Sequence, residues 1–197
     1  MTWITRGVPQ TLLRQVEDEM EGSHRAAAIV GASFVEDHLV DVLKSKMVKD
    51  ENLTRRLFSP GGSHGDFAAK IDLGYLIGAY SREAYEELTI IRRVRNKFAH
   101  ELELNNFERD DIRDYCNHLV LSQSKIVKAI RGEDGHSIAL TLGEWEKERD
   151  EEIPFSDFSF KTSPPSSRDR FATACKFYIA AFAILASHKG DKQEPLF

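Results

Sequence analysis

Ile91-Arg92-Arg93-Val94-Arg95-Asn96-Lys97-Phe98-Ala99-His100 is the stretch of sequence that decides the fold we expect. It ends a predicted helix over about 82–99, for which Ser81 is the expected N-cap. The residues in steps of four and three along its predicted inner face are Ala84, Leu88, Ile91, Arg95 and Phe98. Arg95 therefore stands where an apolar residue is expected. Because a buried charge is costly without a partner, we expect an acid from another helix to face it.

Glu36 is the acid that the spacing offers. A long helix is predicted over about 24–48, with Ser23 as its N-cap. The residues along one face of this helix are Arg25, Ile29, Ala32, Glu36, Leu39, Leu43 and Met47. Glu36 falls in the middle of that series, so the sequence predicts a Glu36–Arg95 ion pair between the two helices.

The rest of the chain reads as further helices joined by polar connectors. Additional helices are predicted over about 9–21, 66–79, 107–131 and 168–188, with inward residues of the third including Cys116 and Gln123. Residues 49–65 read as a connector with a Gly-rich turn, and Ile138 to Leu142 as a short strand or a helical turn. We expect an all-α bundle of five to six helices. It comprises a helical core over 1–131, an irregular charged connector over 132–167, and a C-terminal helix and tail over 168–197.

Composition narrows the function classes. The 197 residues are 41% hydrophobic and 30% charged, and the net charge is −5. This length buries a core without disulfides, so Cys116 and Cys175 are expected to be reduced core thiols of a cytoplasmic protein. An acidic chain makes direct binding of duplex DNA unfavourable, although a local basic strip can still exist. No metal-ligand spacing occurs, and His38 with Asp37 and Asp41 reads as a solvated or boundary face; we expect no metal and no cofactor.

The end of the 82–99 helix carries the densest basic patch in the chain. Its cations are Arg92, Arg93, Arg95 and Lys97, with Asn96 and His100 among them. One interpretation is structural: the cations complement the helix dipole, and His100 caps the C-terminus. The other is a phosphate-contacting site in which Arg stabilises an oxyanion, His exchanges protons and Asn orients the substrate. Nucleotide binding with help from the Gly-rich loop at 61–65 is a third possibility.

Three segments of the chain resemble the mannitol operon repressor family. They are Ala32–Leu39, Gly65–Gly78 and Ile91–His100, and the resemblance spans about Arg25 to Val120. It implies an all-helical bacterial transcription regulator without a DNA-binding motif of its own. The implied mode of action is through a protein partner, and we expect a homodimer without enzymatic activity.

Arg95-Asn96-x-x-x-His100 also resembles the signature of HEPN domains. That resemblance implies a metal-independent endoribonuclease assembled at a dimer interface, with RNA as its substrate. Arg95 and His100 would then be catalytic, Asn96 and Glu36 supporting, and Arg92, Arg93 and Lys97 available for binding. Leu102 stands where some members of the family carry a Tyr.

Overall fold

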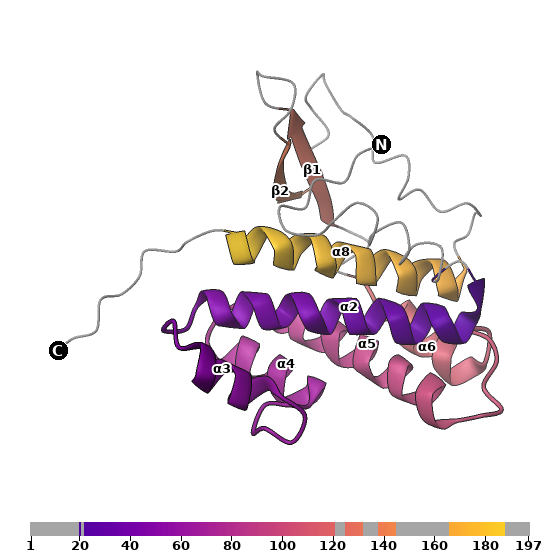
Figure 1. The fold of residues 1–197 in the computed structure, drawn as a ribbon. Helices are drawn as coiled ribbons and strands as arrows, with labels where there is room; N and C mark the ends of the chain where they lie inside the picture. Colours follow the sequence, from indigo (N-terminus) through magenta and orange to yellow (C-terminus); the bar gives the residue numbers. More distant parts are fainter. Residues whose placement is uncertain (1–19, 21, 121–124, 132–137, 145–165, 188–197) are drawn as a thin grey trace.

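The computed structural model describes residues 20, 22–120, 125–131, 138–144 and 166–187. The elements are α2 (His24–Ser45), α3 (Glu51–Phe58), α4 (Phe67–Leu76), α5 (Arg82–His100), α6 (Asp110–Asn117), β1 (Lys125–Arg131), β2 (Ile138–Glu144) and α8 (Ser167–Ser187). The helices pack into one bundle that holds the core, which confirms the all-α prediction (Figure 1). The two strands form an antiparallel hairpin, with Lys125 opposite Glu144 and Arg131 opposite Ile138. The hairpin lies beside α8, on the side away from α2.

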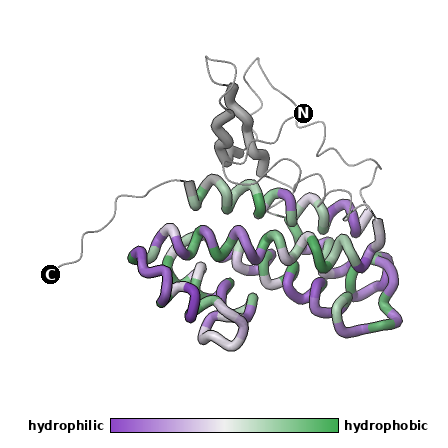
Figure 2. The backbone as a smooth tube through the Cα atoms, viewed as in Figure 1, coloured by the Kyte–Doolittle hydropathy of each residue, from purple (hydrophilic) through white to green (hydrophobic). Residues whose placement is uncertain are grey.

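α2 is the central helix of the bundle, with α8 on one side and α4 and α5 on the other (Figure 1). It approaches α8 closely at Gly31, where an added Cβ would lie 3.2 Å from the sulfur of Cys175. A larger side chain there would push the two helices apart. Cys116 and Cys175 are both buried and free, as expected of reduced core thiols. Figure 2 shows α8 hydrophobic along most of its length, whereas α3 is mostly hydrophilic.

Polar side chains begin the helices where the sequence predicts caps. The Ser23 hydroxyl accepts a hydrogen bond from the N–H of Ala26 at 3.0 Å, and Ser81 caps α5 in the same way. At the start of α8, Ser166 and Asp169 bond reciprocally, each side chain accepting from the other's backbone N–H. These bonds satisfy donors that the first helical turn leaves open.

Two of the predicted boundaries are wrong. The connector over 49–65 contains a helix, α3, which Asp50 caps through the N–H of Leu53. The predicted helix over 107–131 is α6, which ends at Asn117, followed further on by β1. β1 is rich in β-branched residues and finds a partner in β2, which favours a strand. Ile138 to Leu142 lies in β2, so the strand interpretation is correct there.

Other expectations fall outside the described residues. The predicted helix over 9–21 has only its last part described, where Met20 is buried against the core. Gln123 and the charged run after Glu144 lie outside the described part of the chain. Within that part, no helix combines the length and the apolar character needed to cross a membrane.

Candidate functional site

The buried face of α5 differs from the predicted one in two places: Val94 replaces Arg95, and Glu87 is also buried. Its buried residues are Ala84, Glu87, Leu88, Ile91, Val94 and Phe98. Val94 therefore continues the core face, and Arg95 lies at its edge, half-buried. Val94 is three residues after Ile91 and Arg95 is four, and either spacing keeps a residue on the same face of the helix. Of the two, the apolar Val94 occupies the buried position.

The predicted Glu36–Arg95 ion pair is wrong, because Glu36 pairs with Lys70 of α4. The Lys70 Nζ to Glu36 Oε1 distance is 2.5 Å, and the side chains are 8% and 17% exposed. Lys70 lies on the inner face of α4, between the buried Phe67 and Ile71. Its flexible stem brings the ammonium group from that face to the edge of α2. The spacing within α4 indicates that Lys70 is buried. It lies three residues after Phe67 and four before Gly74, and both of these residues face the core.

Arg95 bonds to its own helix. Its guanidinium donates a hydrogen bond of 2.9 Å to the Oδ1 of Asn96, and Arg95 makes no ion pair with any described residue. Arg92 and Arg93 likewise have no acidic partner within the described ranges. Arg93 and His100 are exposed to solvent. Three of the four cations of the predicted basic patch are thus not neutralised by any described acid.

Lys97 differs from the neighbouring arginines because its ammonium group forms ion pairs with two carboxylates. Its Nζ lies 2.8 Å from Asp111 and 3.2 Å from Glu101, and the first of these contacts raises the pKa of Lys97. Arg109 contacts the same two acids, bonding Asp111 through two nitrogens at 2.6 and 2.8 Å. These bonds hold the pKa values of Asp111 and Glu101 below their usual range. The network therefore joins the end of α5 to the start of α6.

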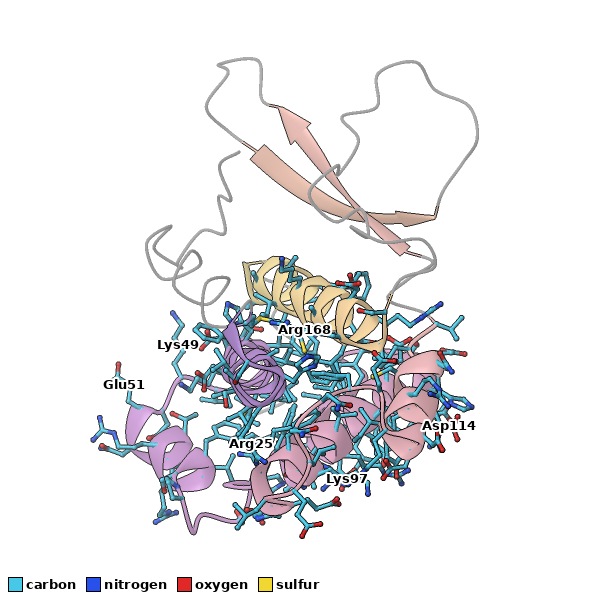
Figure 3. All side chains as sticks on the ribbon, turned by 90° about the vertical axis from the view of Figure 1, so that its right-hand side faces the viewer. Arg25, Lys49, Glu51, Lys97, Asp114 and Arg168 are labelled. Atoms are coloured by element: carbon cyan, nitrogen blue, oxygen red, sulfur yellow. The ribbon has the colours of Figure 1, made fainter. Side chains whose placement is uncertain are left out.

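Arg25 of α2 caps the C-terminus of α5 (Figure 3). Its guanidinium donates to the backbone carbonyl of Phe98, and to those of Glu101, Leu102 and Leu104 at 3.0, 3.1 and 2.8 Å. The last carbonyls of a helix lack partners within the helix, and a cation there also complements the helix dipole. The proposed capping role of His100 is thus filled by Arg25. Nothing in the local sequence of α5 predicted this long-range cap.

The buried polar groups lie away from the predicted patch. His38 is 7% exposed, so its prediction as a solvated or boundary residue is wrong, whereas Asp37 and Asp41 are exposed. Its Nδ1 contacts the carbonyl of Phe34 at 2.8 Å, and its Nε2 has no partner among the described residues. Glu87 accepts a hydrogen bond of 2.9 Å from the hydroxyl of Tyr178. No cluster of side chains suited to a metal ion occurs among the described residues.

Fold and site together define a helical bundle in which Arg25 of the central helix α2 caps the C-terminus of α5, and in which α5 carries a cationic strip formed by Arg92 and Arg93. No protein-family model and no curated protein matches the chain. A chain of the X-ray structure of the MtlR–HPr complex from Escherichia coli is similar to it in fold. The TM-score is 0.53 at 14% identity, with 88% of this chain and 99% of that chain covered. The likeness extends over nearly the whole of that chain, and at this level of identity it concerns the fold alone.

Proposed function

We propose that this protein is a non-enzymatic regulatory module that acts by binding a protein partner. The observation that carries the proposal is the likeness in fold to a chain of the MtlR–HPr complex. HPr is therefore the partner to test first. The resemblance to mannitol operon repressors extends the proposal to a bacterial transcription regulator that works in the cytoplasm, as a homodimer, without contacting duplex DNA itself.

The cationic strip of α5, formed by Arg92 and Arg93, supports a contact with an acidic surface on the partner protein. Arg92 and Arg93 carry charge that no described carboxylate neutralises, and Asn96 is one turn beyond Arg92. Arginine is enriched at protein interfaces, where it forms charge-assisted hydrogen bonds with carboxylates. We therefore assign Arg92 and Arg93 a binding role, whereas Lys97 serves the α5–α6 ion-pair network.

An aromatic cluster at the other end of α5 extends this surface. The rings of Tyr75 and Tyr85 lie 5.1 Å apart, and the Arg82 guanidinium carbon lies 5.7 and 5.0 Å from their centroids. Leu76, next to Tyr75, is 80% exposed. Tyr and Arg are the residue types enriched among the residues that contribute most to binding at protein interfaces, so this cluster is a candidate part of the contact.

Titration calorimetry with purified HPr and the full chain tests the proposal. We expect saturable binding, weakened at least about tenfold when Arg92 and Arg93 are both replaced by Glu, since like charges then face each other. Lys44→Glu/Lys46→Glu, an exposed double charge reversal at the end of α2, is the matched control and leaves the affinity within about twofold. Absence of binding by the folded wild-type chain overturns the HPr assignment. Equal affinity of the Arg92/Arg93 variant overturns the surface.

The alternative function is a metal-independent endoribonuclease with Arg95 and His100 as catalytic residues and Asn96 as their support. The observation in its favour is that all three side chains reach the surface at the end of one helix. No hydrogen bond joins Arg95 to His100 within the described chain, so this activity requires a second copy. Cleavage of single-stranded RNA in the presence of EDTA, abolished by His100→Ala in a folded protein, supports the alternative. Uncleaved RNA rejects it.

A further inference from the structure

α3 and the turn before it form a surface that the bundle leaves uncovered, here called the basic corner (residues 44–56). α3 has no buried residue, and Val48 and Leu53 are 84% and 51% exposed. The five cations of the basic corner are Lys44, Lys46, Lys49, Arg55 and Arg56. All five are exposed, and none makes an ion pair with a described residue. Two acids, Asp50 and Glu51, oppose them, so the corner is cationic in an acidic chain.

The α5–α6 segment has the opposite character and is here called the acidic loop (residues 101–114). Its six acids are Glu101, Glu103, Glu108, Asp110, Asp111 and Asp114, against the cations Arg109 and Arg113. Leu102, the second residue of the segment, is 89% exposed, and Glu103 and Glu108 help to line a hollow that follows it in the chain. The caps from Arg25 and the ion pairs of Arg109 fix the backbone of this loop. It therefore presents one exposed apolar side chain and several carboxylates on a backbone that these contacts hold in place.

The two surfaces cannot meet within one copy of the chain. Arg25, in the first turn of α2, binds the acidic loop, whereas the basic corner begins at Lys44, in the last turn of α2. The 22 residues of α2 span about 33 Å. In Figure 3 Lys49 and Glu51 lie on one side of the bundle and Asp114 on the other. Each copy thus carries a cationic surface at one end and its anionic complement at the other.

We propose that the basic corner docks on the acidic loop of a second copy of this chain. Leu102 of one copy packs against Val48 and Leu53 of the next, and the carboxylates beside Leu102 face the lysines of the corner. Charge complementarity carries this choice of occupant: the five cations of the corner stand beside two exposed apolar residues, and three acids of the loop that make no ion pair with a described residue, Glu103, Glu108 and Asp114, stand near Leu102 or on the same loop. Two copies related by a twofold axis can form this contact twice, the corner of each on the loop of the other, which gives a closed homodimer. This inference deepens the self-association in the proposed function and does not rest on binding of HPr.

Sedimentation velocity of the full chain tests the contact. We expect the weight-average sedimentation coefficient to rise with protein concentration at about 0.02 M NaCl and the association to weaken at least about tenfold at about 0.5 M, where salt screens exposed charges. Lys46→Glu/Lys49→Glu and Glu103→Lys/Glu108→Lys are each expected to remain monomeric, because like charges then face each other. Glu83→Lys, which changes no residue of either surface, associates as the wild type does.

Mixing the two reversed variants separates a designed contact from a folding defect. In the mixture each altered surface meets its altered complement, so association returns, although each variant alone is monomeric. This recovery supports the proposal. A wild-type chain that is monomeric at every concentration overturns it. Association that persists in both reversed variants also overturns it, because the copies then associate through another surface. Binding of HPr is measured separately, so failure of the contact and failure of the proposed function are distinct.

Discussion

Replacing Lys70 by Met removes the cation that neutralises Glu36 inside the bundle. The Nζ–Oε1 distance of 2.5 Å and the exposed fractions of 8% and 17% define a largely buried pair. Breaking such a pair by removing one partner costs about 3–5 kcal/mol, since the other charge stays buried alone. Glu36 keeps some contact with water, so we expect the lower end, about 3 kcal/mol. For a chain of this size that is a fall in Tm of about 6–12 °C.

Urea and thermal unfolding followed by circular dichroism at the helical band measure this change. Arg95→Met is the matched control, and we expect it to alter the free energy of unfolding by less than about 0.5 kcal/mol, because Arg95 holds no acid. The double variant Glu36→Leu/Lys70→Met is expected to return to within about 1 kcal/mol of the wild type, since no charge is then stranded. Stability lost in Arg95→Met and kept in Lys70→Met would refute the reasoning.

Three further changes test the packing around the site. Arg25→Met should cost about 3 kcal/mol in urea unfolding, about 1 kcal/mol for each half-buried carbonyl it caps; an unchanged midpoint would exclude the cap. Gly74→Ala should cost about 1–3 kcal/mol in the same assay, because its Cβ would lie 2.5 Å from the Tyr80 hydroxyl; a neutral effect would contradict the close approach. Burial, and next the charge of Arg168, lower the pKa of His24 from 6.5. The folded protein therefore binds this proton more weakly than the unfolded chain, and stability should hold above pH 6.5 and fall as the pH drops through the lowered pKa. His24→Gln should flatten that slope, and an identical slope would assign it to other groups.

Helical spacing and capping chemistry predicted most of the bundle from the sequence. α2, α4, α5 and α8 lie close to their predicted bounds, and Ser23 and Ser81 cap where expected. These features depend on residues within a few positions of each other, so the local pattern contains them. Beyond Asn117 the local pattern was insufficient, because β1 exists through its pairing with β2.

The candidate site was harder to predict than the fold. A step of three or of four keeps the same helix face, so the spacing alone left both Val94 and Arg95 eligible for the core of α5. The partner of Glu36 depends on how α4 crosses α2, and the Arg25 cap depends on a contact across 73 residues of sequence. Such pairings are set by packing between helices, which single-sequence periodicity does not contain.

Titration of the full-length wild-type chain with purified HPr tests the central claim most directly, with single-stranded RNA as the parallel ligand. The account predicts a saturable heat of binding for HPr and intact RNA after prolonged incubation. A folded chain that gives no heat with HPr and cleaves the RNA would contradict it.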